Sequence, residues 1–262
     1  MFHFLMTSRT VKIAAAMAGA AVLAATAVAA DRSDDRRPGA GAAKSIVLGK
    51  TKNYPDAACA NARTCQVIAR VTGVQMAADG MRRPFEVPED GQLVSWWLRL
   101  PKLTDSQIKS FNKLFGGDPS ARVVVLRHGI RSRYRLVKQS DTVELRDKLG
   151  SKGRVTLRLA QPLEVKKGDV IGVSAVTWMP SFAVGLSAAG NNWLASRPHA
   201  RCQTPSSRDI KRFKRYYKHS DAQLETSTAK PYECTYQTAR LIYWARIVPT
   251  ATQQPGSTTP TS

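Results

Sequence analysis

The segment from Arg197 to His219 carries the residue types best suited to contacting another molecule, because it combines many cations with spaced aromatic rings. It holds eight Lys or Arg residues and one acidic residue, Asp209. Its apolar residues recur at helical spacing, so we expect a helix from Arg208 to Lys218 that Ser206 and Asp209 cap. Aromatic rings among Lys and Arg suit phosphate and headgroup binding. The candidate polyanion contacts in this helix are Arg208, Lys211, Arg212, Lys214, Arg215 and Lys218.

The same helix has a structural interpretation. One of its stripes is apolar or aromatic and consists of Ile210, Phe213, Tyr216 and Tyr217. Such a stripe commonly packs on the parent domain, which leaves the basic face in water. The sequence keeps both interpretations open.

A second basic run extends from Arg122 to Lys138 and contains six Lys or Arg residues and no acidic residue. On alternating strands, part of these cations must share an exposed face. Arg131 and Arg133 are the candidate polyanion contacts in this run. Whether the two basic runs adjoin depends on the fold.

No spacing typical of a catalytic or metal site appears in the chain. The three histidines beyond the N-terminal segment lie among cations, which disfavour an imidazolium. The densest acidic cluster, Glu86, Glu89 and Asp90, is explained by capping of a turn. We therefore expect no catalytic residue, no metal and no cofactor. A hydrolase whose site is assembled from scattered residues is the alternative.

Five tryptophans could form a platform for sugar rings: Trp96, Trp97, Trp178, Trp193 and Trp244. On strands most tryptophans belong to the core, and Trp96 and Trp244 fall on apolar faces. We expect these two to be buried.

The first 29 residues have the organisation of a secretory signal peptide. Arg9 and Lys12 precede an apolar, uncharged stretch, and Ala27-Val28-Ala29 fits a small-x-small cleavage site. We expect a secreted, extracellular protein; retention by an uncleaved N-terminal anchor is the alternative. Residues 30–45 and 250–262 read as a flexible lead-in and a disordered tail.

The four cysteines form an even set in a chain expected to be exported, which favours two disulfides over free thiols. Three pairings are possible, and proximity favours Cys59 with Cys65 and Cys202 with Cys234. Neither pair has the short spacing of a zinc knuckle. The second disulfide would close the base of a basic helical excursion, residues 197–234.

The charge balance predicts attraction to polyanions. Without Arg9 and Lys12 the formal net charge falls only from +21 to +19. Such a surface attracts anionic envelope polymers, phospholipid headgroups and nucleic acid at low salt. The alternative is that a strongly basic exported protein only stays soluble and adheres loosely to an anionic envelope, without a dedicated site.

Short runs with period-two alternation predict an all-β protein, an antiparallel β-sandwich or jelly-roll-like domain over residues 46–249 with two short helical insertions. The expected strands are Cys65–Val71, Leu93–Leu100, Arg122–Arg127, Tyr134–Lys138, Val143–Arg146, Arg154–Leu159, Val170–Thr177, Phe182–Leu186, Asn192–Ala195 and Leu241–Val248. In the second of these, Val94 should share the apolar face of Trp96, and Arg99 should lie on the polar face.

Turn and capping residues divide these strands. Asp79-Gly80, Asp90-Gly91 and Lys167-Gly168-Asp169 supply positions expected to need positive φ. Thr104 and Gln107 resemble a capping box at the start of the other helix, which Gly116-Gly117 should end.

Two segments carry a family resemblance: Phe85–Trp96, a strand after a P-x-D-G turn, and Leu163–Gly172, a strand after a K-G-D turn. With a cysteine pair upstream and a closing strand near Trp244, the chain resembles uncharacterised exported β-sandwich proteins of actinobacteria over residues 46–249. The resemblance implies a jelly-roll-like fold and no activity. The excursion at residues 197–234 departs from the compact pattern.

We therefore expect a secreted, non-catalytic binding or structural protein that contacts a glycan or an anionic polymer at the cell exterior. An extracellular hydrolase is the first alternative. Binding of nucleic acid or anionic lipid through the basic helix is the second, and we expect no specific nucleic acid and no transmembrane span in the mature chain.

Overall fold

The computed structural model describes residues 44–60, 65–206 and 208–250. The expected signal peptide lies outside these residues, as do the expected lead-in up to residue 43 and the expected tail from residue 251. Within the described part, no helix has the length and apolarity needed to span a bilayer.

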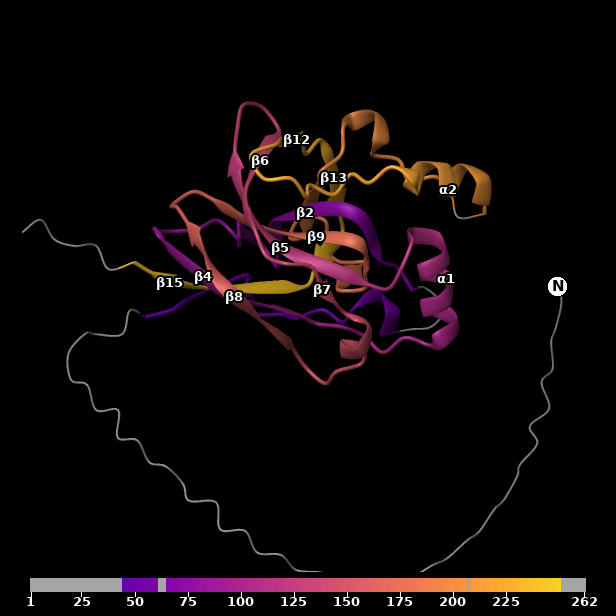
Figure 1. Cartoon of the computed structure of the whole chain (residues 1–262), viewed down its shortest axis with the longest axis horizontal. Coiled ribbons are helices and arrows are strands. Elements are labelled where there is room, and N and C mark those ends of the chain that lie inside the picture. Colours follow the sequence, from indigo (N-terminus) through magenta and orange to yellow (C-terminus); the bar gives the residue numbers. More distant parts are fainter. Residues whose placement is uncertain (1–43, 61–64, 207, 251–262) are drawn as a thin grey trace, which may run out of the picture. The chain divides into compact units, whose positions relative to one another are not determined.

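Two antiparallel sheets form the body of the described part (Figure 1). The smaller sheet consists of β1 (Ile46–Leu48), β4 (Gly91–Leu98), β8 (Val155–Val165) and β15 (Tyr243–Pro249). The larger sheet consists of β2 (Ile68–Ala78), β3 (Met81–Arg82), β5 (Ser120–His128), β6 (Arg133–Gln139), β7 (Val143–Glu144), β9 (Val170–Met179), β11 (Asn192–Ala195), β12 (Ala229–Pro231) and β13 (Cys234–Gln237). A separate ribbon pairs β10 (Phe182–Val184) with β14 (Ala239–Leu241).

The strand order is β1-β15-β4-β8 in the smaller sheet and β12-β6-β5-β9-β2-β11-β13 in the larger, where β3 pairs with β2 and β7 with β5. The prediction of an all-β sandwich with two helical insertions is confirmed. The two helices are α1 (Asp105–Phe115), between β4 and β5, and α2 (Ile210–Lys218), between β11 and β12. The described part also contains the 3-10 turns η1 (Ala58–Ala60) and η3 (Arg146–Lys148), which lie between strands, and η4 (His199–Arg201), which precedes α2.

The main core lies between the two sheets and draws apolar side chains from both. Trp96 and Leu98 of β4 belong to this cluster together with Val173 and Met179 of β9. A buried hydrogen bond also crosses the core, because the Tyr243 hydroxyl donates to the carbonyl of Ile171 at 2.8 Å. The two sheets are thus joined by apolar packing and by a directional contact.

Two expectations for β4 are wrong. A register shift between Leu93 and Ser95 shows a bulge, so Leu93 rather than Val94 is buried with Trp96. Gly91 does not have positive φ. A glycine is required there because a Cβ atom would lie 2.5 Å from the carbonyl oxygen of Val248.

The expected strand Leu241–Val248 is divided in two. Ile242 lies between β14 and β15, and its backbone N–H donates to Ser181, whose hydroxyl donates back to the Ile242 carbonyl. These bonds turn the chain from the ribbon with β10 into the smaller sheet. The strand expected from Cys65 begins later, at Ile68, and continues to Ala78.

The first helical insertion, α1, follows the prediction closely. Thr104 and Gln107 form the expected capping box, and Gly116 ends the helix with φ of 84°. The Trp178 indole of β9 donates to the Asn112 side chain and to the Gly117 carbonyl, which ties the end of α1 to the larger sheet.

The second helical insertion, α2, packs at the same end of the sandwich as α1 (Figure 1). Phe213 is buried against Phe115 of α1, with ring centroids 6.0 Å apart. Asp209 is the N-cap and accepts from the N–H of Arg212, whereas Ser206 accepts from the N–H of Arg208 before the helix begins. Packing of the apolar stripe is therefore observed, except that Ile210 is exposed.

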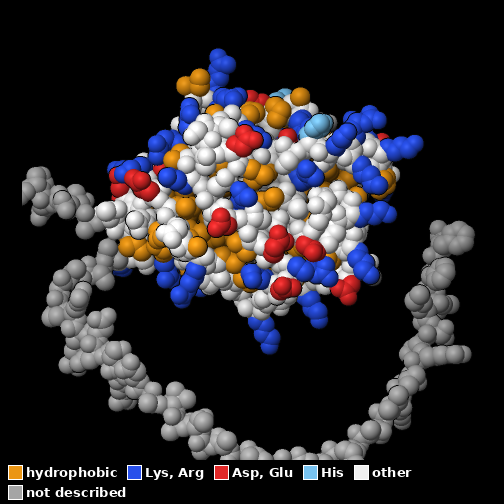
Figure 2. All heavy atoms as spheres, viewed as in Figure 1, with side chains coloured by type: hydrophobic (Ala, Val, Ile, Leu, Met, Phe, Trp, Pro, Cys, Tyr) orange, Lys and Arg blue, Asp and Glu red, His pale blue; other side chains and the backbone are white. Residues whose placement is uncertain are grey.

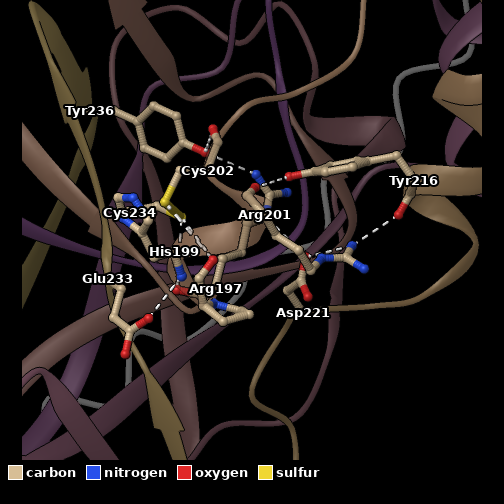
Figure 3. Close-up of a disulfide and its surroundings, with 10 residues drawn as sticks. Arg197, His199, Arg201, Cys202, Tyr216, Asp221, Glu233, Cys234 and Tyr236 are labelled. Carbon is tan, nitrogen blue, oxygen red and sulfur yellow. Dashed lines mark hydrogen bonds and ion pairs between the residues drawn. A yellow bond between two sulfur atoms is a disulfide. The ribbon is translucent and has the colours of Figure 1, made fainter.

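Both expected disulfides, Cys59–Cys65 and Cys202–Cys234, are present. Figure 3 shows the second one beside a cluster of charged and aromatic side chains at the base of the excursion. Arg197 donates to Asp221 at 2.9 Å and to the Tyr236 hydroxyl at 3.2 Å, and Arg201 donates to the same Asp221 oxygen at 3.0 Å. One carboxylate therefore holds two guanidinium groups where the excursion meets the sheet.

We predict that Asp221→Asn lowers the free energy of unfolding by about 3 kcal/mol or more, because it leaves the buried Arg197 without its counter-charge. Asp56→Asn is the matched control: both carboxylates lie 2.9 Å from an arginine, but the Asp56 side chain is 76% exposed and that of Asp221 12%. The control should cost less than about 1 kcal/mol. Denaturant unfolding of both variants measures the difference, and equal losses would contradict it.

Removing the two disulfides should have unequal effects. Cys202–Cys234 spans 32 residues and Cys59–Cys65 spans 6, so the chain-entropy model gives about 4 and about 2 kcal/mol. Paired Cys→Ser variants, compared by denaturant unfolding, test this order. A larger loss from the shorter loop would show that the loop model fails here.

Candidate functional site

The outer face of the smaller sheet presents aromatic and basic side chains in two rows across the strands. In one row, Trp244 of β15 is paired with Trp97 of β4, which is paired with Thr156 of β8. In the next row, Arg246 of β15 is paired with Ser95 of β4, which is paired with Arg158 of β8. Residues directly opposite on antiparallel strands lie on the same face, so each row is continuous.

Two hollows lie over these rows, and we call them together the outer-sheet groove. One has a volume of about 590 Å³ and is lined by Val47, Lys50, Tyr54, Trp97, Arg99, Gly153, Arg154, Trp244 and Arg246. The other has a volume of about 420 Å³ and is lined by Val94, Ser95, Trp97, Thr156, Arg158 and Arg246. They adjoin, because Trp97 and Arg246 line both.

Aromatic rings form the floor of the groove. Trp97 and Trp244 are 8% and 1% exposed, whereas Tyr54 is 40% exposed. The Tyr54 and Trp244 ring centroids are 5.5 Å apart. The Trp244 indole N–H is buried and has no hydrogen-bond partner among the described residues.

Guanidinium groups stack on this floor. Arg154 lies 5.6 Å from the Trp244 centroid and Arg246 lies 5.1 Å from the Trp97 centroid. At these distances the ring quadrupole attracts the cation. The rings therefore contact the flat faces of the Arg154 and Arg246 guanidinium groups, which leaves the N–H donors at their edges for a ligand.

The groove contains more positive charge than its neighbours neutralise. Arg99 is paired with Asp56 at 2.9 Å and donates to the Tyr54 carbonyl at 3.2 Å. The other four cations, Lys50, Arg154, Arg158 and Arg246, have no ion pair within 4.0 Å among residues 44–60, 65–206 and 208–250. An anion in the groove would find these charges unpaired.

This arrangement is suited to recognition. The arginine fork matches carboxylate and phosphate oxygens in a bidentate manner. Aromatic rings at the same place offer an apolar surface to the C–H face of a sugar. The described lining residues of the two hollows include no carboxylate, imidazole or thiol, and no group of three or more potential metal ligands occurs in the described part.

The candidates on α2 are exposed but lie elsewhere. Arg208, Lys211, Arg212, Lys214, Arg215 and Lys218 all face water, so α2 has the basic face expected from the sequence. Figure 1 shows α2 beside α1 and away from β6, which carries the last part of the second basic run. Figure 2 shows Lys and Arg side chains spread over the visible face, with fewer acidic ones among them.

Some cations of the second basic run make hydrogen bonds to other parts of the protein. Arg133 donates to the Ala229 carbonyl at 2.7 Å, while Arg131 is exposed in the turn before β6 with φ of 56°. Arg127 donates twice to the buried Asp169, and these hydrogen bonds raise the pKa of Arg127. This run therefore supplies both internal contacts, through Arg127 and Arg133, and an exposed cation, Arg131.

The outer-sheet groove was missed by the reading of the sequence. The alternation placed Arg99 and Arg158 on polar faces correctly, and Trp244 is buried as expected. The available signal was the i, i+2 pairing of a tryptophan with an arginine in two strands, Trp97 with Arg99 and Trp244 with Arg246. Their convergence depends on the pairing of β15 with β4, which no local pattern reveals.

No protein-family model, curated protein or solved structure matches this chain, so its function has to be argued from the chemistry of the groove.

Proposed function

We propose that this is a secreted, non-catalytic protein that binds an acidic glycan or similar anionic polymer of the cell exterior through the outer-sheet groove. The observation that carries the proposal is the double row of tryptophan and arginine across β15, β4 and β8. The two disulfides are typical of a protein that folds in an oxidising environment, which supports an extracellular role.

An acidic polysaccharide fits both halves of the groove chemistry. Its carboxylates or phosphates would meet Arg154, Arg158 and Arg246, and its sugar rings would pack near Tyr54 and Trp97. Two adjoining hollows of about 590 and 420 Å³ offer more room than one small anion needs, which favours a polymer. The surrounding positive charge would speed association at low salt.

The basic face of α2 supports a second candidate site for the same class of ligand, or for nucleic acid or anionic lipid. Its side chains are exposed, and its Phe213 anchors the helix without using the charges. However, the structure places no aromatic floor beneath these cations: the Tyr216 and Tyr217 rings are half-buried, and both stack on Arg197. Charge alone would give weaker and less selective binding there.

The two sites can be separated with variants of equal charge. We predict that Arg154→Gln/Arg158→Gln/Arg246→Gln weakens binding to polygalacturonate about tenfold or more, since it removes three charge-assisted donors. The matched variant Lys211→Gln/Arg212→Gln/Arg215→Gln removes the same charge from α2 and should change affinity less than about threefold. Binding is measured by calorimetry over a range of salt concentrations, with neutral dextran as the uncharged ligand.

The salt dependence adds a second criterion. The groove variant should reduce the slope of log K against log salt by about two to three, as expected for three lost contacts. Thermal midpoints should change by only a few degrees, because the replaced charges face solvent. Equal losses of affinity in both variants would show that the polymer is attracted only by the overall charge. A larger loss in the α2 variant would show that the polymer binds to the helix instead of the groove. The appearance of new reducing ends in the polymer would show hydrolysis and contradict the non-catalytic assignment.

A further inference from the structure

The smaller hollow of the outer-sheet groove differs chemically from the larger one, and we call it the polar hollow. The larger hollow is lined by three aromatic side chains, whereas Trp97 is the one aromatic residue among the described residues that line the polar hollow. Two of its other lining residues, Ser95 and Thr156, carry hydroxyl groups, and two more, Arg158 and Arg246, carry guanidinium groups. The side chains of the polar hollow are therefore mainly hydrogen-bond donors.

Ser95 lies at the middle of this set. On β4 it is paired with Arg246 of one neighbouring strand and with Arg158 of the other, so the serine lies between the two arginines on the same face. Ser95 is 6% exposed, and its hydroxyl makes no hydrogen bond with a described residue. Its oxygen is also not one of the unpartnered polar atoms that the protein covers completely. This hydroxyl is therefore available to a group bound in the hollow.

The two arginines are close enough to bind one group together. Neighbouring strands lie about 4.7–4.9 Å apart, so the Cα atoms of Arg158 and Arg246, which are two strands apart, are separated by roughly 10 Å. Both side chains are exposed, and neither forms an ion pair with a described residue. The Arg246 guanidinium stacks on Trp97, which also lines the hollow, at 5.1 Å from the ring centroid.

Acidic residues near the polar hollow do not neutralise these two charges. None of its described lining residues is acidic. The row of the sheet beyond Ser95 contains Glu164, whose carboxylate is bound to Lys166 at 2.8 Å. Beside the larger hollow, Asp56 is bound to Arg99 at 2.9 Å. Two guanidinium charges therefore remain for a ligand.

We propose that the polar hollow is the anion subsite of the groove and that it binds a phosphate monoester, so that the polymer bound there is a phosphorylated glycan. A phosphate monoester carries about −1.5 to −2 charges at pH 7 and has three strong acceptor oxygens. This charge matches two guanidinium groups, whereas a carboxylate or a sulfate ester brings a single negative charge.

The shape of the phosphate also fits the donor set. Its oxygens do not lie in one plane, so they can accept from the Ser95 hydroxyl below and from Arg158 and Arg246 at the two sides. The sugar that carries the phosphate would then lie over Trp97, toward the aromatic residues of the larger hollow. This inference rests on the proposed function, because it assigns a chemical group to the same groove.

The test compares three derivatives of one neutral polymer at equal degrees of substitution: the phosphate monoester of dextran, carboxymethyl-dextran and dextran sulfate. Calorimetric titration of the whole exported protein should show that dextran phosphate binds about tenfold or more tightly than either of the others near pH 7.5, because both arginines gain a charged partner.

Acidification gives an independent readout. The second pKa of a phosphate monoester is about 6, so lowering the pH from about 7.5 to about 5 should weaken dextran phosphate binding about tenfold relative to carboxymethyl-dextran. The ratio of the two affinities cancels any general gain from protonated histidines. The arginines of the hollow stay charged in this range, and the hydrogen bond from Lys166 lowers the pKa of Glu164, which stays ionised.

Three variants locate the subsite. Ser95→Ala removes the central hydroxyl and should weaken dextran phosphate binding about threefold to tenfold, but carboxymethyl-dextran binding less than about twofold. Ser132→Ala is the matched control: it removes an exposed hydroxyl in the turn before β6 and should leave both affinities within about twofold. Arg158→Lys keeps the charge and loses the planar fork, and it should weaken dextran phosphate binding about threefold or more.

Several results would overturn the phosphate inference. They are equal affinities for dextran phosphate and carboxymethyl-dextran, equal affinities for dextran phosphate and dextran sulfate, a ratio that does not change with pH, and unchanged phosphate binding in Ser95→Ala. If Ser95→Ala lowers the thermal midpoint, the exposed Arg158→Lys variant decides instead.

The same titrations separate this inference from the proposed function. If all acidic polymers bind equally and the triple groove variant weakens them all, the groove is the binding site but has no phosphate subsite. If no acidic polymer binds, or if the triple groove variant binds each of them normally, the proposed function itself fails.

Discussion

Successive side chains of a strand point to opposite faces of its sheet, and this alternation joins the core of the smaller sheet to its outer-sheet groove. On β4, Trp96 and Leu98 are buried between the sheets, so Trp97 and Arg99 must lie outside. The same rule places Arg246 of β15 outside. A slip of one residue would bring guanidinium groups into the core, so the burial of apolar side chains also fixes the spacing of the cations.

The helical end of the molecule depends on a different balance. Asp221 serves two arginines, and the Cys202–Cys234 disulfide closes the chain beside them. Together they hold a strongly basic helix against the apolar residues of α1 without neutralising its exposed face. Charged residues that hold the fold together, such as Arg197 and Asp221, are therefore buried at the base of the excursion. The Lys and Arg residues of α2 lie on the surface, where they can contact another molecule.

Local signals in the sequence predicted the local structure well. The capping box at Thr104, the pairing of Cys202 with Cys234 and the period-two strands all depend on neighbouring residues or on parity. The bulge after Leu93 and the close approach of Gly91 to β15 depend on a partner strand that is remote in sequence. The outer-sheet groove needs three strands in a set order, so its residues were visible in the sequence and their proximity was not.

The position of β15 has a consequence for how the chain reaches its folded form. This strand lies between β1 and β4, so β1 cannot be joined to the rest of the smaller sheet until β15, the last described strand, is available. Contacts between segments so distant in sequence form slowly, and β1 cannot pair until β15, its one partner among the described strands, is available. For a protein proposed to cross a membrane, late closure keeps the chain loose enough to be threaded, and the groove forms only after β15 has joined β4.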